Sequence, residues 1–389
     1  MAKVSGTCDP RFEEVRRLLG ENVESGEELG ASIAINIDGK LVVDMWAGYA
    51  DEDRSRLWER DTIVNVWSCT KTVLSLAVLM LVDQGRVDVD EKVSKYWPEF
   101  GYNGKGDVLV RHLLSHTSGL SGFKEHVTAQ HLYDFDASAA RLGKQAPWWT
   151  PGTASGYQSL TMGFLLGELI RRVTGKSFKQ FVADEIAAPL DADFQVGAAE
   201  KDLQRVTDIV PSKSPIDFSN IEPDSIAMKT FHRPLLKPEV ANAADWRKAD
   251  LGASNGHGNA RSLVRILSAV TLGGEVDGKR LLSEKTINLI GREQANGQDL
   301  VLGLPIRWAI GFAMTPSGVH TFLPQDEGGR VYFWGGWGGS WIVMDLDRRT
   351  TISYVMNKMG DGVGGNSRGQ AYGEAIYRAM SKACNGSRA

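Results

Sequence analysis

Segments with the pattern of β-strands occur at both ends of this 389-residue chain, whereas helical patterns fill the middle. Two β-rich runs in residues 31–50 flank Asp38-Gly39, a dipeptide that favours a tight hairpin turn. Four more strand-like runs follow Leu304, and they read RWAIGFAM, GRVYFWGG, GSWIVMDLD and TTISYVMN. Strands from both ends share one sheet only if the middle of the chain leaves the sheet and returns. The sequence therefore predicts a mixed α/β (α+β) lobe built from both ends, with a mainly helical lobe inserted.

The change in pattern also predicts where the lobes meet. Helical segments separated by Pro- and Gly-rich turns dominate residues 86–249, so we assign this range to the helical lobe. Residues 1–85 and 250–389 are then the α/β lobe. Within the insertion, the polar stretch 198–250 shows no clear periodicity, and it is either a cap over a site or an excursion on the surface.

Four helices outside the insertion have clear signals. Residues Pro10–Gly20 carry an apolar stripe that ends at a glycine, and GEAIYRAM is expected to close the chain. The run TVLSLAVLMLVDQG is apolar nearly all round, which predicts a buried helix with Gly85 as its C-cap. Asn259 is a favourable N-cap for the helix that follows it.

Composition and charge narrow the classes of function. The chain is 42% hydrophobic and 24% charged, which is typical of globular proteins. A net charge of -4 and a pI near 6.0 give no electrostatic basis for binding nucleic acid or an anionic membrane. Cys8, Cys69 and Cys384 are scattered and form no C-x-x-C pair, so neither a disulfide framework nor a structural zinc site is expected.

Targeting signals are also missing from the sequence pattern. The first residues lack the signature of a signal peptide, and the longest apolar run, Val73–Val82, is too short to span a bilayer. We therefore expect a soluble, cytoplasmic protein with no membrane partner. The sequence does not indicate an oligomeric state.

The segment WSCTK places Ser68 and Lys71 three residues apart at the predicted start of the buried helix. A lysine on the same face as the serine would lose proton affinity by desolvation and could activate the hydroxyl. The alternative is an ordinary N-cap serine followed by a solvated lysine. The same spacing recurs at Ser121 and Lys124, so this motif alone leaves both interpretations open.

Two other features are possible catalytic motifs. GASNG (residues 252–256) matches the G-x-S-x-G elbow, in which Ser254 would be the nucleophile, but that elbow requires a buried strand before it and a helix directly after it. Polar residues precede this match, so a glycine-rich loop is favoured. His116 could be a general base, although a tight-turn residue bonded to the backbone is the favoured role. None of the seven histidines has the spacing of zinc ligands.

Three stretches taken together carry a family resemblance. They are WSCTK, PGTASGYQSLTMGFLLGELI with Tyr157, and VYFWGGWGGSWIVMDL. Jointly they resemble the class C β-lactamase and penicillin-binding-protein superfamily, and within it the family VIII carboxylesterases. The resemblance runs from about Val23 to Met356. It implies a β-lactamase-like fold, with a mixed antiparallel sheet flanked by helices, an inserted helical lobe, and the active site between the two.

The resemblance also implies roles for individual residues. Ser68 would be the acylated nucleophile, Lys71 its activating partner and Tyr157 the general base. The ammonium of Lys71 would keep the phenol partly ionised. Which of the two takes the serine proton stays open, because they would titrate as a coupled pair. Ser159 would orient Lys71 or the substrate.

The third stretch departs from the lactamase pattern. Trp334-Gly335-Gly336 stands where lactamases present Lys-Thr-Gly, so this position has no cation to hold a β-lactam carboxylate. This difference favours uncharged esters. The backbone N–H groups of Ser68 and Trp337 would form the oxyanion hole.

Several aromatic residues are candidates for the pocket wall, namely Trp148, Trp149, Tyr332, Trp334 and Trp337. For Trp148 and Trp149, a place in the core of the helical lobe is as well supported by the sequence as a place in the pocket wall. Trp341 is assigned to the core of the sheet.

The resulting prediction is a carboxylesterase that cleaves small to medium uncharged esters through an acyl-enzyme on Ser68, with no metal and no organic cofactor. An amidase, D-peptidase or weak β-lactamase on the same site is the first alternative. The second is a non-catalytic binding module, which the presence of Ser68, Lys71 and Tyr157 disfavours. The third is an α/β-hydrolase that uses Ser254.

Overall fold

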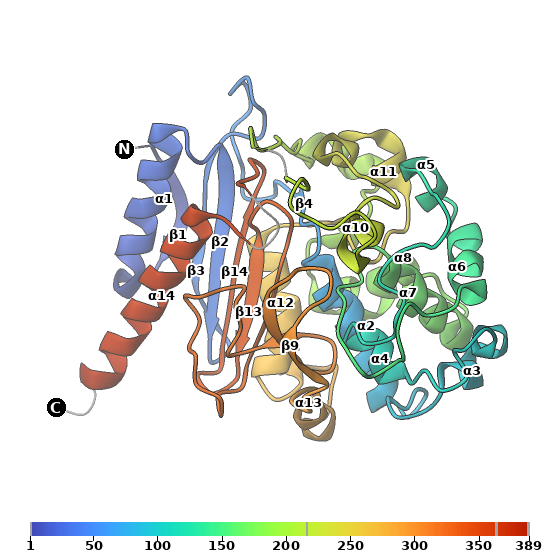
Figure 1. The fold of residues 1–389 in the computed structure, drawn as a ribbon. Coiled ribbons are helices and arrows are strands. Elements are labelled where there is room, and N and C mark those ends of the chain that lie inside the picture. Colours follow the sequence, from blue (N-terminus) through green and yellow to red (C-terminus); the bar gives the residue numbers. More distant parts are fainter. Residues whose placement is uncertain (1, 215–216, 362–364, 387–389) are drawn as a thin grey trace.

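The computed structural model describes residues 2–214, 217–361 and 365–386, with side chains described as far as residue 382. Its centre is a nine-stranded antiparallel sheet in the order β1-β3-β2-β14-β13-β12-β11-β10-β9. Strands from the two ends of the chain meet where β2 pairs with β14, and Figure 1 shows these blue and red strands side by side. The predicted fold class is confirmed.

The strands of this sheet are β1 Val4–Cys8, β2 Gly30–Ile37, β3 Lys40–Gly48, β9 Ala295–Gln298, β10 Pro305–Trp308, β11 Ala313–Met314, β12 Val331–Gly335, β13 Trp341–Asp345 and β14 Thr350–Met356. Two small sheets are formed by β4 Val64–Asn65, β5 Phe194–Val196 and β6 Gly256–Gly258, and by β7 Glu275–Val276 and β8 Lys279–Arg280. The helices are α1 Glu13–Ser25, α2 Thr70–Asp83, α3 Val93–Tyr96, α4 Val110–Leu114, α5 Ala129–Leu132, α6 Phe135–Lys144, α7 Thr161–Thr174, α8 Phe178–Phe181, α9 Ala188–Leu190, α10 Ile226–Phe231, α11 Ala244–Lys248, α12 Ala260–Thr271, α13 Glu284–Ile290 and α14 Ser367–Gly386.

Turn and cap residues behave largely as their chemistry predicts. Asp38 and Gly39 both have positive φ (50° and 84°) between β2 and β3, which is the geometry of a tight hairpin turn. Asn259 caps α12, because its side chain accepts a hydrogen bond from the Ser262 amide at 3.0 Å. The predicted end at Gly20 is wrong. The helix α1 continues to Ser25, and the left-handed residue that ends it is Gly26, with φ 80°.

Helices cover both faces of the sheet. The helices α1 and α14 pack together against the outer face, and α12 packs on β2, β13 and β14 from the other side. The strand β2 is therefore buried from Gly30 to Ile35, and Ser32 is the one polar side chain in that stretch. No helix in the described part of the chain has both the length and the apolar character that a bilayer crossing requires.

The helix α2 lies between the sheet side of the molecule and the helices on the other side (Figure 1). It packs against α12 and α13 from one direction and against α7 from the other, and its residues 70–81 are all buried. An apolar helix with no solvated face requires such neighbours on every side. The boundaries of the two lobes stay a prediction, and β5, which lies within 86–249, pairs with β6 outside that range.

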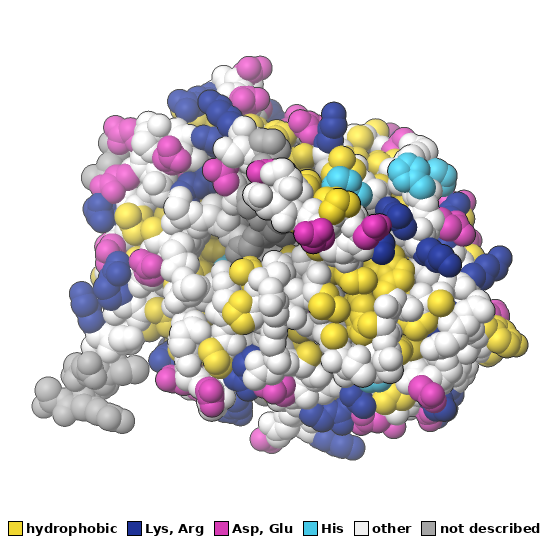
Figure 2. Space-filling view, in the orientation of Figure 1, with side chains coloured by type: hydrophobic (Ala, Val, Ile, Leu, Met, Phe, Trp, Pro, Cys, Tyr) yellow, Lys and Arg dark blue, Asp and Glu magenta, His cyan; other side chains and the backbone are white. Residues whose placement is uncertain are grey.

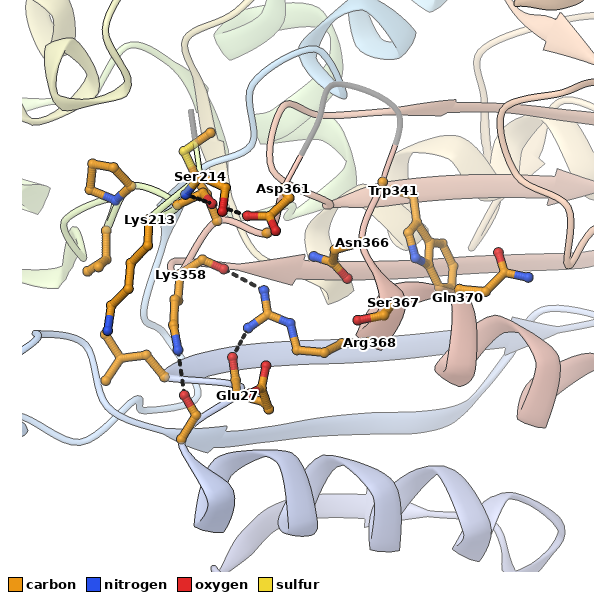
Figure 3. Close-up of a pocket in the computed structure, with 18 of the residues that line it drawn as sticks. Glu27, Lys213, Ser214, Trp341, Lys358, Asp361, Asn366, Ser367, Arg368 and Gln370 are labelled. Carbon is orange, nitrogen blue, oxygen red and sulfur yellow. Dashed lines mark hydrogen bonds between the residues drawn. The ribbon is translucent and has the colours of Figure 1, made fainter. Parts of the chain in front are cut away.

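A buried ion pair ties the start of α14 to the sheet. The Arg368 guanidinium lies 3.2 Å from the Glu28 carboxylate, which also accepts a hydrogen bond from the Tyr354 hydroxyl at 2.7 Å. Both Glu28 and Arg368 are buried, and burial raises the pKa of the carboxyl. In Figure 3, Arg368 also donates to the backbone carbonyls of Glu27 and Lys358. The start of α14 is therefore held to the sheet by the desolvated ion pair between Arg368 and Glu28.

We predict that Arg368→Ala lowers the free energy of unfolding by about 3–5 kcal/mol, because the Glu28 carboxylate would stay buried without its counter-charge. Arg378→Ala is the matched control on the same helix. Its partner is Glu14, both side chains are about half exposed, and its loss should cost less than about 1 kcal/mol. Urea denaturation of both variants measures the difference. Similar small losses in the two variants would contradict the prediction.

Candidate active site

The backbone before Ser68 has an unusual conformation. Trp67 lies in the left-handed region with φ 48°, which is rare for a bulky aromatic residue. Its ring packs against Trp246 and Trp337, with centroids 5.7 and 5.0 Å away, and this packing holds the conformation. The chain thus turns from β4 into α2 at Ser68. Cys69 is the N-cap of α2, the hydrogen bonds of the Ser68 hydroxyl oxygen are with Lys71 and Tyr157, and Lys71 is buried, so the alternative of an N-cap serine with a solvated lysine is wrong.

The structure brings Ser68, Lys71 and Tyr157 together. The Nζ atom of Lys71 lies 3.0 Å from Ser68 Oγ, and the Tyr157 hydroxyl donates to the same oxygen at 2.7 Å. Lys71 Nζ also donates to two backbone carbonyls, at 2.7 Å to Ser159 and 2.9 Å to Ala253. The amine is therefore held between two separate segments and directed at the serine oxygen. Ser159, predicted to orient Lys71 or substrate, contacts the lysine through its carbonyl.

The electrostatics of this cluster follow from burial. Lys71 is buried with no carboxylate among its partners, and desolvation holds the pKa of its amine well below the ordinary lysine value. Burial likewise raises the pKa of the Tyr157 phenol, although the hydrogen bond that it donates to Ser68 and the one that it accepts from Trp334 oppose this shift. These directions run against the expectation that an ammonium keeps the phenol partly ionised, which stays a prediction. Both groups are driven towards their neutral forms.

Trp334 contacts the cluster directly. Its indole N–H donates to the Tyr157 hydroxyl oxygen at 3.2 Å. This residue was predicted only as part of the pocket wall, and the hydrogen bond gives it a second role in holding the phenol.

Asp299 supports Tyr157 from behind, and no sequence motif indicated it. Its carboxylate accepts from the Tyr157 amide at 3.0 Å and from the Trp308 indole N–H at 3.3 Å. The Trp308 ring is parallel to the Tyr157 ring, with centroids 6.4 Å apart. The phenol is thereby fixed through both its backbone and its ring.

His116 is a turn residue, as the sequence indicated. It has φ 60°, and its Nδ1 accepts a hydrogen bond from the Gln158 amide at 3.1 Å. Burial holds the pKa of its imidazole well below 6.5, so it is neutral, and its ring packs edge-on against Tyr157. Its place is beside the phenol, not beside the serine.

A cavity of about 820 Å³ opens over the cluster and has mainly apolar walls. Its apolar lining residues include Trp67, Leu160, Phe218, Ile221, Phe231, Leu235, Leu236, Val301, Leu302, Leu304, Val319, Trp334, Trp337 and Met359. Residues within 211–214 and 218–239 supply one wall, so this part of the polar stretch 198–250 is a cap over the site. Figure 2 shows hydrophobic side chains gathered on this face of the molecule.

The predicted wall residues separate into two groups. Ser159, Trp334, Gly335 and Trp337 line the cavity, whereas Trp148 and Trp149 do not. The Trp148 ring lies against Gly122, and the Trp149 ring packs on Gly156 and donates its N–H to the Ala154 carbonyl at 3.0 Å. These two tryptophans support loops behind the site. The other aromatic residues, Tyr332 and Trp341, are buried in the sheet.

Gly336 and the proposed oxyanion donors lie next to Ser68. A side chain at Gly336 would place a Cβ 2.5 Å from the Val66 carbonyl, so only glycine allows this approach. Among the described residues, neither the Ser68 amide nor the Trp337 amide has a hydrogen-bond acceptor. Both residues line the cavity, and their role as an oxyanion hole stays a prediction.

The competing motifs have no catalytic geometry. Ser121 accepts a hydrogen bond from Thr230 and has none with Lys124, whose side chain is exposed. No strand leads directly into Ser254, because the element before it is the helix α11. The helix α12 begins only at Ala260, so the strand–turn–helix arrangement of the elbow is absent. Ser254 nevertheless lines the catalytic cavity, and its buried hydroxyl has no hydrogen-bond partner.

A second cavity of about 1090 Å³ lies beside the first, and Figure 3 shows its charged lining, including Lys213, Lys358 and Asp361. The two cavities share part of one wall, formed by Pro211, Ser212, Ser214, Val319, Met359 and Gly360. The second one contains none of Ser68, Lys71 and Tyr157. Within the described ranges, no cluster of three His, Cys, Asp or Glu side chains could hold a metal ion.

Comparison with known proteins agrees with this geometry. The sequence model of the β-lactamase family matches residues 15–376. The chain is 33% identical to the esterase/β-lactamase LipL of Mycobacterium tuberculosis, over 81% of this chain and 76% of LipL. It is 27% identical to the esterase EstB of Burkholderia gladioli, over 84% and 85% of the two chains.

Solved structures show the same relationship. A family VIII carboxylesterase superposes with a TM-score of 0.89 at 36% identity, covering 97% of this chain and all of that one. A penicillin-binding-protein homologue from Caulobacter crescentus has the same TM-score and coverage at 35% identity. The chain therefore belongs to the β-lactamase family, and it is a serine hydrolase of the family VIII carboxylesterase type.

Proposed function

We propose that this protein hydrolyses small to medium uncharged carboxylic esters through an acyl-enzyme on Ser68. The observation that carries the proposal is the Lys71 amine, which is buried, clamped by the carbonyls of Ser159 and Ala253, and 3.0 Å from the serine oxygen. An amine that donates its two N–H bonds to two carbonyls has its lone pair left for the serine proton. A desolvated lysine of this kind is a base at neutral pH.

In the first step, Ser68 Oγ attacks the ester carbon while its proton passes to Lys71. The amides of Ser68 and Trp337 would bind the negative oxygen of the tetrahedral intermediate. As the bond to the alcohol breaks, Tyr157 donates its proton to the leaving oxygen, and the Lys71 ammonium returns a proton to the phenolate. The alcohol leaves, and Ser68 carries the acyl group.

In the second step, water attacks the acyl-enzyme and gives its proton to the same pair of groups. The bond from the acyl carbon to Ser68 Oγ breaks, and Oγ regains a proton as the acid is released. The Trp334 indole N–H stays bound to the Tyr157 oxygen in both steps, which keeps the phenol proton directed at the serine side. No charged group has to enter or leave the site.

The cavity supports uncharged substrates. Its walls are mainly apolar, and its charged lining residues are Lys237 and Glu239, one of each sign, both from the cap. Trp334 supplies no positive charge for a carboxylate. Apolar surface of this extent favours binding of an acyl chain.

A second activity follows from one relative. LipL is named both an esterase and a β-lactamase, so we include weak β-lactam hydrolysis on the same serine as the second candidate. We predict that kcat/KM for p-nitrophenyl butanoate exceeds that for a chromogenic cephalosporin by at least about 100-fold, because no cation faces the lactam carboxylate. Steady-state kinetics with both substrates measures the ratio. A ratio near one would contradict the prediction, and a ratio well below one would make the lactamase activity primary.

The nucleophile is tested by covalent labelling. We predict that a p-nitrophenyl phosphonate adds one phosphonyl group to the protein and that Ser68→Ala abolishes this adduct, as intact mass spectrometry would show. Ser121→Ala is the matched control, because its serine belongs to the competing motif and makes no contact with Lys124. Labelling that survives in Ser68→Ala would overturn the proposal.

The protonation state of Lys71 is tested through stability. A folded-state pKa below 10.5 means that the unfolded chain binds one more proton, so stability from this residue rises with pH between the two pKa values. We predict that the free energy of unfolding of the wild type, relative to Lys71→Met, rises by about 1.4 kcal/mol per pH unit across this window. Urea denaturation from pH 6 to pH 9 measures it. A flat difference would show that Lys71 is charged in the folded protein.

A further inference from the structure

Ser254 is a buried polar residue in the catalytic cavity that the mechanism does not use. It is 4% exposed, and its hydroxyl has no hydrogen-bond partner among the described residues. Other hydroxyls in this wall are paired: Thr230 donates to Ser121, and Ser212 donates to Asp361. A buried hydroxyl without a partner has lost its hydrogen bonds to water, and no hydrogen bond within the free protein replaces them.

The backbone holds Ser254 in one place. Its amide donates to the Leu251 carbonyl at 2.9 Å, and the next residue, Asn255, donates through its side chain to the carbonyls of Trp246 and Ala249, each at 2.9 Å. Asn255 also forms an isolated parallel β-bridge with Trp67, the residue directly before Ser68. The backbone that carries the hydroxyl is therefore held in place before any ligand binds.

The position of Ser254 relative to Lys71 indicates which part of a substrate it meets. The Lys71 amine lies between the carbonyls of Ser159 and Ala253. Tyr157, which gives its proton to the leaving alcohol, belongs to the first of these segments. The alcohol part of the ester is therefore expected on the side of Ser159, and the acyl part on the side of Ala253 and Ser254.

We propose that the Ser254 hydroxyl is a specificity-determining group that hydrogen-bonds to a polar atom of the acyl part, close to the ester carbonyl. The substrate class is then esters of oxygen-substituted acids, such as hydroxy or alkoxy acids. This inference rests on the proposed function, since it assigns the acyl side from the role of Tyr157. A simple alkanoate leaves the hydroxyl unpaired and gains nothing from it.

The test compares p-nitrophenyl methoxyacetate with p-nitrophenyl butanoate, whose acyl groups differ by one oxygen in place of one CH₂. The ratio of their kcat/KM values is divided by the ratio of their rates with hydroxide, which removes intrinsic reactivity. We expect the corrected ratio to favour methoxyacetate in the wild type and to fall about tenfold in Ser254→Ala, the effect of one neutral hydrogen bond. Thr230→Val, which alters a cavity hydroxyl that is already paired, should keep the wild-type ratio.

A corrected ratio in Ser254→Ala that stays within about threefold of the wild type would overturn the inference, whatever happens to the absolute rates. Ser254→Cys replaces the hydroxyl with a weak donor of similar shape and should give the same loss, so it serves if the alanine variant does not fold. Phosphonate labelling of Ser68 in the same samples separates the two proposals. Labelled enzyme with an unchanged ratio rejects only the role of Ser254, whereas unlabelled wild type rejects the esterase mechanism itself.

Discussion

The site depends on the burial of one amine without a counter-ion. Lys71 has no carboxylate partner, so its charged form is disfavoured and two carbonyls from distant segments hold its N–H groups. This burial requires α2 to be enclosed from the sheet side by α12 and from the helical side by α7. The inserted helices therefore keep this lysine out of water, which the proposed role of Lys71 as a base requires.

The same desolvation explains why a tryptophan suits position 334. A cation there would face the Tyr157 oxygen and favour its phenolate form. The indole N–H holds that oxygen at 3.2 Å without adding charge. Because burial disfavours the charged forms of both the amine and the phenol, the cluster has little charge with which to attract an anionic substrate. The electrostatics of the cluster and the apolar cavity thus favour the same class of ester.

The family resemblance, and not spacing alone, pointed to Ser68, Lys71, Tyr157 and Trp334, and the structure brings these four side chains together. The hairpin at Asp38 could be predicted from its turn residues. Backbone carbonyls have no sequence signature, so the contribution of Ala253 could not be predicted. The cap, which is formed by residues within 211–214 and 218–239, lacks periodicity because it lies over a cavity instead of packing a regular face into the core. Trp148 and Trp149 pack behind the site and do not line the cavity. Aromatic character alone therefore does not distinguish a residue of the cavity wall from one that supports the wall.

The G-x-S-x-G match in residues 252–256 has a physical cause that differs from the elbow it resembles. A side chain on Gly163 of α7 would place a Cβ 2.6 Å from the Ala253 amide, and one on Gly256 would meet Thr70 Oγ1 at 2.7 Å. Glycines at these points let the loop approach α2 and α7 closely enough for the Ala253 carbonyl to reach Lys71. The same close packing fixes Ser254 in the cavity wall. The G-x-S-x-G pattern indicates a nucleophile in the α/β-hydrolase fold. In this protein it results from the close packing that lets the Ala253 carbonyl bind Lys71.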